Sequence, residues 1–576
     1  MALSNNPNLE NPSRLIRQYA YLNLGTGTFG GKLSYDQQKG GVPLMYNAEA
    51  EQLVVDPTDS HTLVFGSSGS KKTRTVVMPS IHVLCQAGES MIIHDAKGEL
   101  YARTAAMLMR NGYEVIPVNF RKPECGYAWN PLDIPYRYYK SGDMDRAAEF
   151  SNDVASTITL GDVGNSKDPF WEHSAHDCLF GLILLLFRYC KENNLPDEAV
   201  NMANLASLRR NLFRTGIGIR PMNSWLWKWG SEDELIASSL SGTVMTADDT
   251  MKGILSTLDQ KLRTFIINNS LMDMMANSNF DLDCVGKKKT ALFLITPDEK
   301  TSYHPLVAIF VSQSYQRLIY LAEANDGRVK CRVNYILDEF SSLPAIGSDF
   351  PSMIAAARSR NIRFLLVAQS KSQLVHRYRE EAATIMANCN NWIIMFTREL
   401  ELLREISELC GTRENNKPNV TVYDLQHLSK EQNQALLLAG RLKPIVTELM
   451  DIKRMDGERF VRADFPTPGR KKRHTLSFDN PPLSFQREPE RKPEKDEGFS
   501  PFADRFKKEE LFRSPFGEPD TDKRSESSTI NVDDLVAKID RKIAELEAEE
   551  ELEKVTDQIE RRRRELVAAD NPVEKE

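Results

Sequence analysis

The sequence lacks the features that mark secreted, zinc-binding and membrane-spanning chains. Its eight cysteines are scattered and none forms a C-x-x-C pair, which argues against a disulfide framework or a structural zinc site and favours reduced thiols. The first residues, Met1 to Arg17, are polar and contain proline, unlike a signal peptide. No run of about 20 apolar residues exists, and the longest apolar stretch, Leu179 to Phe187, is too short to span a bilayer. We therefore expect a soluble protein, or one held at a membrane only through partners.

A large excess of charge of one sign is also missing. The 576 residues carry a formal net charge of −7, with 27% charged and 41% hydrophobic residues, which is an ordinary composition for soluble domains. This balance argues against a protein that coats nucleic acid over its whole surface, while local basic surfaces remain compatible with it. The length has room for about two or three domains.

One stretch has the pattern of a phosphate-binding loop. The apolar run Leu63 to Phe65 predicts a short buried strand, which is followed by a small, polar loop, by Lys72-Thr73 and by a helix-like segment. In such a loop, consecutive backbone N–H groups and the helix N-terminus bind phosphate. We expect Lys72 to reach the β- and γ-phosphates and Thr73 to ligate Mg²⁺. The predicted nucleotide-binding residues are Gly66, Ser67, Ser68, Gly69, Ser70, Lys71, Lys72 and Thr73.

The motif has one defect, because Lys71 stands where the pattern G-x-x-x-x-G-K-[ST] requires its second glycine. A Cβ atom there crowds a loop whose backbone must approach phosphate closely. Lys71 keeps its amide N–H and adds a positive charge, so phosphate binding stays compatible with the sequence, whereas fast hydrolysis is in doubt. A flexible Ser/Gly turn before a basic helix is the alternative interpretation.

The patterning divides the chain into five segments. Residues 1–44 are polar and glycine-rich and predict an irregular N-terminal arm. Short buried strands that alternate with helices over 45–140 and again over 286–465 predict one α/β nucleotide-binding domain with a mostly parallel sheet. The helical periodicity of 141–285 predicts an all-α domain inserted into it. Residues 466–576 are rich in proline and charge, which predicts a flexible tail.

Individual elements follow from the same patterns. One long charged helix is predicted in the tail at about 533–566. Its apolar face docks on a partner or on another copy of the chain, or the helix is solvated without a partner. The basic run Arg470 to Arg473 is a candidate for contact with DNA phosphates or anionic lipid. After the strand before the phosphate loop, strands are predicted at 90–95, 113–118, 290–295, 333–337, 363–367, 392–396 and 446–450.

Two of these strands end in residues suited to nucleotide chemistry. The strand at 333–337 leads to Asp338 and Glu339, at the edge where a parallel sheet binds its ligands. We expect Asp338 in the Mg²⁺ shell and Glu339 against the attacking water. The strand at 363–367 leads to Gln369, which can contact both the γ-phosphate and the water.

Two arginines, Arg358 and Arg360, stand at a predicted helix end just before that last strand. In a ring of subunits, such an arginine reaches the neighbour's γ-phosphate and stabilises charge in the transition state. Surface arginines on an amphipathic helix are the alternative interpretation.

Together these motifs resemble the type IV coupling proteins, the TraG/TraD-type DNA-pumping ATPases of conjugation and type IV secretion. The resemblance covers about residues 45 to 450, and its motifs occur in the family's order. They are Gly66–Thr73, His94–Leu100, Trp129–Leu132, Asp168–Trp171, Leu337–Phe340 and Ala368–Ser370.

The resemblance implies a RecA-like P-loop ATPase that uses ATP and Mg²⁺ and assembles as a homo-hexamer. It implies that the protein recruits conjugative DNA with its relaxase (the relaxosome), or a nucleoprotein substrate, and pumps single-stranded or double-stranded DNA to a type IV secretion channel. The inserted helices correspond to the family's all-α domain, which meets the substrate. By this resemblance Lys72, Glu339, Gln369 and Arg358 are the catalytic residues, with Arg360 as the alternative arginine, and Thr73 and Asp338 bind the metal.

The chain departs from the family at Lys71 and in lacking the N-terminal transmembrane helices of most members. We expect a cytoplasmic protein held at the inner face of the cell membrane by an anchor protein, unless the anchor lies outside this chain. Two other functions stay open. A weakly hydrolysing substrate receptor or adaptor of the secretion system is favoured by Lys71 and opposed by Asp338-Glu339, and a DNA-packaging or partitioning pump would share the ATPase core.

Overall fold

The computed structural model describes residues 9–12, 15, 19–23, 40–161, 168–213, 233–347, 349–413, 416–456 and 461–478. They belong to one compact unit, Met1–Gln486. The helix predicted at about 533–566 lies outside the described residues.

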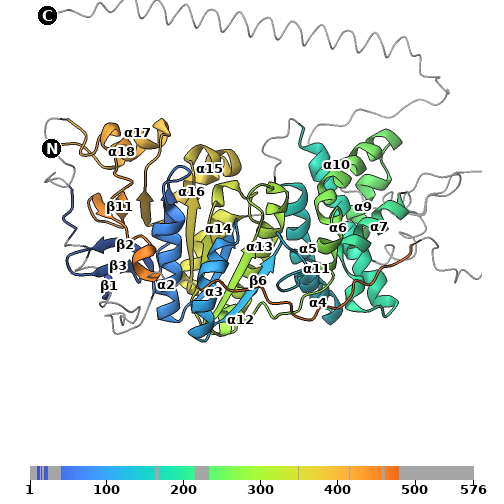
Figure 1. The fold of residues 1–576 in the computed structure, drawn as a ribbon. Helices are drawn as coiled ribbons and strands as arrows, with labels where there is room; N and C mark the ends of the chain where they lie inside the picture. Colours follow the sequence, from blue (N-terminus) through green and yellow to red (C-terminus); the bar gives the residue numbers. More distant parts are fainter. Residues whose placement is uncertain are drawn as a thin grey trace, which may run out of the picture. The chain divides into compact units, whose positions relative to one another are not determined.

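A nine-stranded sheet is the centre of the α/β region (Figure 1). Its strands run in the order β12-β11-β10-β4-β9-β8-β5-β7-β6. Neighbours from β10 to β6 are parallel, and β11 and β12 add an antiparallel edge, which confirms the predicted mostly parallel α/β sheet. The strands are β4 (Thr62–Phe65), β5 (Ser90–Asp95), β6 (Glu114–Asn119), β7 (Thr290–Ile295), β8 (Val333–Leu337), β9 (Ile362–Ala368), β10 (Asn391–Ile394), β11 (Gln434–Ala439) and β12 (Ile445–Glu448).

Both faces of this sheet are buried, because successive side chains of each strand point to opposite faces. In β7, Leu292 and Leu294 belong to one apolar core and Phe293 and Ile295 to the other. The second core lies under π-helix η2 (Thr73–Val77), α2 (Met78–Ala87) and α3 (Glu99–Arg110). The first core includes residues of α13 (His304–Glu323), α14 (Phe350–Ala357), α15 (Lys371–Tyr378), α16 (Glu381–Asn388), α17 (Leu400–Leu409) and α18 (Val422–Gln426).

Between β6 and β7 the described chain is helical and contains no strand. The stretch Leu179 to Phe187 is buried within α6, at the centre of these helices. Among the described residues, no helix combines the length and apolarity that a membrane crossing requires. The helices are α4 (Asp133–Ser141), α5 (Met144–Thr159), α6 (Phe170–Glu192), α7 (Met202–Leu212), α9 (Glu234–Val244), α10 (Asp248–Ile266), α11 (Asn269–Met274) and α12 (Cys284–Lys287).

Short elements complete the described fold. The 3₁₀ turns are η4 (Asp197–Ala199), η6 (Thr301–Tyr303), η7 (Phe340–Ser342) and η8 (Arg358–Arg360), and α19 (Lys453–Asp456) is the last described helix.

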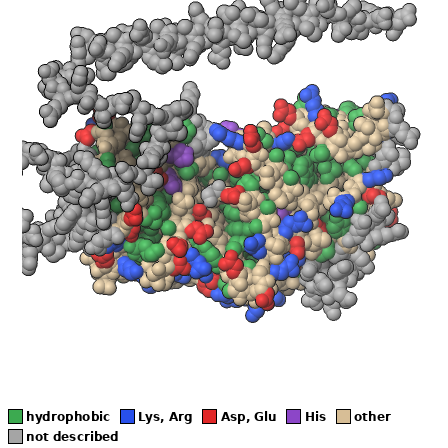
Figure 2. All heavy atoms as spheres, turned by 180° about the vertical axis from the view of Figure 1, so that it is seen from behind, with side chains coloured by type: hydrophobic (Ala, Val, Ile, Leu, Met, Phe, Trp, Pro, Cys, Tyr) green, Lys and Arg blue, Asp and Glu red, His purple; other side chains and the backbone are tan. Residues whose placement is uncertain are grey.

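Over the face drawn in Figure 2, Lys and Arg side chains are interspersed with Asp and Glu among the coloured residues.

The irregular arm predicted for residues 1–44 is wrong in part, because a second sheet begins there. Strands β1 (Ala20–Asn23), β2 (Val42–Asn47) and β3 (Gln52–Asp56) pair antiparallel in the order β1-β3-β2. Leu44 of β2 and Val54 of β3 are fully buried in the core under α2. The strands pack on α2, a separate segment of the chain, so local patterning does not predict this contact. The many glycines in residues 1–44 also favoured the interpretation as an irregular arm.

The flexible tail predicted from residue 466 is likewise wrong for residues 466–478, which lie against the folded chain. Gly126 N–H donates to the Pro466 carbonyl over 2.8 Å, and the Asn204 side chain donates to the His474 carbonyl over 2.8 Å. Phe478 is only 5% exposed. The extended backbone bonds to residues of other segments, which no local pattern predicts.

The basic run Arg470 to Arg473 is therefore occupied by contacts within the chain. Arg470 Nη2 donates to the Gly126 carbonyl over 2.7 Å, Lys471 pairs with Glu198, and Arg473 pairs with Asp273 over 3.5 Å. These contacts weaken its interpretation as a DNA or lipid contact.

Candidate nucleotide-binding site

The predicted phosphate loop leaves β4 at the carboxyl edge of the parallel strands. Gly66 N–H donates to the carbonyl of Ala368, the last residue of β9, over 3.3 Å, and Ser67 N–H donates to the Phe396 carbonyl after β10 over 3.0 Å. The loop is thus bound on both sides. Gly69 has a φ of +75°, which glycine adopts at little cost, and a Cβ on Gly66 would lie 2.6 Å from Ser70 Oγ. The tight turn therefore explains both glycines.

Lys72 lies at the centre of this loop. Its Nζ donates to the carbonyls of Gly66 and Ser67 over 2.5 and 3.1 Å. Burial lowers the pKa of Lys72, while the charges of Asp338 and Glu339 oppose this shift. The ammonium is therefore held inside the loop and faces two carboxylates, which is where a phosphate-binding lysine must lie.

A chain of polar contacts joins the loop to the ends of β8 and β9. Thr73 Oγ1 donates to Asp338 Oδ2 over 3.1 Å, and Gln369 Nε2 donates to Glu339 Oε1 over 3.3 Å. Glu339 has a φ of +57°, a left-handed conformation that costs energy for a residue with a Cβ. The structure therefore brings together five of the predicted site residues, which are Lys72, Thr73, Asp338, Glu339 and Gln369.

A buried histidine contacts the backbone carbonyl of Asp338, and a threonine side chain contacts this histidine. His94 Nδ1 donates to the Asp338 carbonyl over 2.6 Å, and Thr296 Oγ1 donates to His94 Nε2 over 3.0 Å. Burial lowers the pKa of His94 to about 3, with the neighbouring His304 adding to the shift, so the ring is neutral. Burial also raises the pKa of Asp338 to about 6, and the charge of Glu339 contributes. A bound cation would oppose both effects and favour the Asp338 carboxylate.

Lys71 adopts a glycine-like conformation but directs its charge elsewhere. Its φ is +71°, and its Nζ donates to the Lys430 carbonyl and to Asn433 Oδ1, both over 2.8 Å. The Lys71 ammonium, which the sequence suggests as an extra charge for phosphate, therefore binds the segment before β11 instead. Lys430 Nζ in turn lies 3.8 Å from where a Cβ on Gly69 would be. Sequence reasoning missed Lys430 and Asn433 because they are 359 and 362 residues from Lys71 and belong to no motif.

Arg358 and Arg360 lie apart from the other predicted site residues. They form η8 directly before β9, at the amino edge of the parallel strands, whereas Gln369 follows the same strand at the carboxyl edge. The seven residues of β9 separate the two edges by about 20 Å. Arg358 is exposed, and Arg360 Nη1 folds back onto the Ala356 carbonyl over 3.0 Å. Within one chain, neither arginine is close to Lys72.

The residues at the loop fit a nucleotide with magnesium. Thr73 and Asp338 offer hard oxygen ligands, and Ser70 Oγ is buried without a hydrogen-bond partner among the described residues. No cluster of three or more His, Cys, Asp or Glu side chains in the described part of the chain forms a metal site by itself. Magnesium is commonly held by one or two protein oxygens together with substrate phosphates, which matches this donor set.

Strand order, loop and flanking carboxylates define the class: this is an α/β protein with a nucleotide-binding fold of the P-loop kind. Solved structures share the fold. The unbound bacterial conjugative coupling protein TrwBΔN70 has a TM-score of 0.53 and 14% identity, over 73% of this chain and 91% of that one. Plasmid coupling protein TrwB in complex with ADP and Mg²⁺ has a TM-score of 0.52 and 15% identity, over 71% and 90% of the two chains. TrwB in complex with a non-hydrolysable ATP analogue has a TM-score of 0.51 and 15% identity, over 72% and 91%.

Residues 24–444 match the family described as type IV secretory system conjugative DNA transfer, and the chain belongs to that family. No curated protein matches the chain.

Proposed function

We propose that this protein is an ATP-driven coupling protein, which recruits conjugative DNA or a nucleoprotein substrate and pumps it to a type IV secretion channel. The observation that carries the proposal is the contact of Thr73 with Asp338 and of Gln369 with Glu339 beside the phosphate loop. Such a set of residues both binds a nucleotide and activates water, which a purely binding protein does not need.

Each side chain has a distinct role in this proposal. The loop N–H groups and Lys72 bind the β- and γ-phosphates, and Thr73 and Asp338 hold Mg²⁺, which neutralises phosphate charge when bound. Glu339 accepts the proton of the attacking water. Gln369 orients Glu339 and the water through its 3.3 Å contact. The strained Glu339 backbone supports a functional reason for this geometry.

The position of Arg358 supports assembly as a ring. Because it lies at the amino edge of the sheet, Arg358 acts only on a nucleotide bound to a neighbouring subunit. We propose a homo-hexamer in which residues 45–140 and 286–465 bind the nucleotide. The helices of 141–285 then meet the relaxosome or other substrate. A membrane anchor protein holds this assembly at the inner face of the cell membrane, beside the channel.

The test is DNA-stimulated ATP hydrolysis by the 576-residue chain beside Glu339→Gln, with nucleotide binding measured separately. Turnover in the parent that is lost in Glu339→Gln, with nucleotide affinity retained, is the expected result. Loss of affinity together with turnover contradicts the role of Glu339 in chemistry. Absence of turnover in the parent with DNA present contradicts the motor.

A second candidate function, a weakly hydrolysing substrate receptor, is favoured by one observation. The φ of +71° at Lys71 places a side chain where the motif requires glycine. If the parent binds nucleotide without turnover and Lys71→Gly restores turnover, the receptor is the better description. Family membership favours conjugative transfer over a packaging or partitioning pump.

A further inference from the structure

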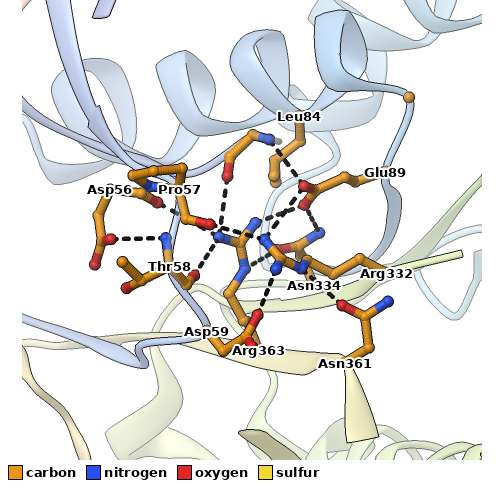
Figure 3. A network of polar contacts seen from close by, with 12 residues as sticks. Asp56, Pro57, Thr58, Asp59, Leu84, Glu89, Arg332, Asn334, Asn361 and Arg363 are labelled. Carbon is orange, nitrogen blue, oxygen red and sulfur yellow. Dashed lines mark hydrogen bonds and ion pairs between the residues drawn. The ribbon is translucent and has the colours of Figure 1, made fainter. Parts of the chain in front are cut away.

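The turn that carries Arg358 is held by a network of polar contacts at the amino edge of the sheet. Figure 3 shows part of this network, in which residues before β4 and β5 contact residues at the start of β8 and β9. The turn η8 ends at Asn361, whose φ of +65° is left-handed. Asn tolerates this conformation better than most residues, so the chain reverses sharply between Arg358 and β9.

Three contacts from one neighbouring segment fix this turn. Arg328 Nε donates to the Ser359 carbonyl over 3.0 Å, and Val329 N–H donates to the Arg360 carbonyl over 3.2 Å. Arg332 Nε donates to Asn361 Oδ1 over 2.9 Å. The residues preceding β8 therefore hold the chain from Ser359 to Asn361, directly after Arg358.

One carboxylate holds both of these arginines. Asp59, in the link between β3 and β4, accepts from Arg328 Nη2 over 3.0 Å and also pairs with Arg332 Nη2. The Arg332 side chain is 5% exposed and also pairs with Glu89 over 3.5 Å. The Arg328 side chain is 53% exposed, so Asp59 and the turn are its main restraints.

The Arg358 side chain has no hydrogen-bond or ion-pair partner among the described residues, although it is exposed on this fixed turn. Arg360 is turned back onto its own helix by Ala356. A rigid backbone that presents one unpaired guanidinium is the arrangement expected for a group that must meet a partner without reorganisation.

We propose that Asp59, Arg328 and Arg332 are positioning residues for Arg358, and that they fix the Arg358–Asn361 turn so that Arg358 meets the phosphates bound by a neighbouring subunit. The inference rests on the proposed function, because it requires Arg358 to act across a subunit interface. It adds three residues that no phosphate-loop motif includes. Asp59 touches neither the nucleotide nor Arg358 and acts through the two arginines.

Subunit mixing tests this role. Lys72→Ala subunits lack a working phosphate loop but keep Arg358, whereas Asp59→Asn subunits keep the loop and lose the support of the turn. We expect Asp59→Asn alone to lower DNA-stimulated kcat by about tenfold to a hundredfold, because small misplacements of a catalytic group have effects of this size. KM for ATP and the affinity for a fluorescent ATP analogue stay within about twofold, since the protein's own loop is intact.

Equimolar mixing of Asp59→Asn with Lys72→Ala then restores turnover, because about a quarter of the interfaces in a randomly mixed ring combine an intact loop with an intact turn. Arg328→Gln, at an exposed side chain, gives the same recoverable loss and guards against misfolding of Asp59→Asn. Glu114→Gln removes a similarly exposed ion pair with Lys288, at the start of β6, and leaves turnover unchanged.

Unchanged turnover in Asp59→Asn overturns the inference. So does a loss that Lys72→Ala subunits do not restore while they do restore Arg358→Ala, because the role of Asp59 is then structural. A parent without turnover, or an Arg358→Ala mixture without recovery, overturns the proposed function and the inference with it.

Discussion

Lys71 shows how one residue outside a motif's pattern is accommodated by contacts the motif does not contain. A left-handed conformation costs a residue with a Cβ about 1 kcal/mol or more. The two 2.8 Å hydrogen bonds of Lys71 Nζ, to Lys430 and Asn433, contribute a similar amount. A lysine in place of glycine is therefore close to neutral for stability, although it lies in the predicted phosphate loop.

We predict that Lys71→Gly changes the free energy of unfolding by less than about 1 kcal/mol, because the lost hydrogen bonds and the relieved backbone strain offset each other. Turnover rises, because the loop backbone approaches phosphate more closely. Lys71→Met keeps the strain and loses the bonds, so it destabilises by about 1 to 2 kcal/mol without a gain in turnover. Denaturant titration and ATPase rates on both variants measure this, and equal stability in the two contradicts the account.

The predicted site residues that the fold brings together are those that a local sequence pattern marks. Lys72 and Thr73 stand inside one loop, and Asp338 and Glu339 directly follow an apolar strand. Their long-range partners are different, since Asn433 is an ordinary polar residue until the fold brings it to Lys71. Asp59 has no local signal either, because its role depends on two arginines far along the chain.

At the scale of elements, helices α5 and α13 meet around a buried acid. Asp153 of α5 is 5% exposed and accepts from Ser312 Oγ over 2.8 Å and from the Gln316 side chain. Burial raises the pKa of Asp153 to about 6, and Glu149 on the same helix adds to the shift. The folded state therefore binds this proton more tightly than the unfolded state, so the stabilisation is complete below about pH 4 and is lost as pH rises through 6.

We predict that Asp153→Asn removes this pH dependence. Relative to the parent, the variant gains up to about 3 kcal/mol of unfolding free energy between pH 4 and pH 7.5. Denaturant midpoints measured across that range give the difference. Asp145→Asn, at an exposed position of the same helix, is the matched control for the removal of one carboxylate. A difference between Asp153→Asn and the parent that does not change with pH contradicts the raised pKa of Asp153.

The packing of apolar residues explains which elements the sequence predicts. Strands β5, β7 and β8 match the predicted ranges because each contains several apolar residues close together and is buried along its whole length. Strand β11 was not predicted, although its neighbours β10 and β12 were, in part. The loop helix begins as the π-helix Thr73–Val77 rather than an α-helix, a choice of hydrogen bonding that side-chain periodicity does not encode.

At the scale of the whole described unit, one buried carboxylate ties the small antiparallel sheet to the main sheet (Figure 3). Glu89, before β5, pairs with Arg363 of β9 over 2.5 Å and accepts from Gly40 N–H over 2.8 Å. Arg363 Nη1 donates to the carbonyls of Gly40 and Thr58, each over 3.0 Å. These contacts join the segments on either side of β2 and β3 to the edge that carries Arg358.

We predict that Glu89→Gln loosens this junction selectively, because Arg363 and Arg332 remain buried with less compensating charge. Removing one partner of a buried ion pair costs about 3 kcal/mol or more. Amide hydrogen exchange in β2 and β3 therefore accelerates, while exchange in η2 and α2, at the phosphate loop, changes less. Glu114→Gln removes a partly exposed pair with Lys288 at the same sheet edge and leaves exchange in β2 and β3 unchanged. Equal acceleration of exchange throughout the α/β region would mean that Glu89 stabilises the fold as a whole. Unchanged, slow exchange in β2 and β3 would mean that apolar packing under α2 alone holds the second sheet in place.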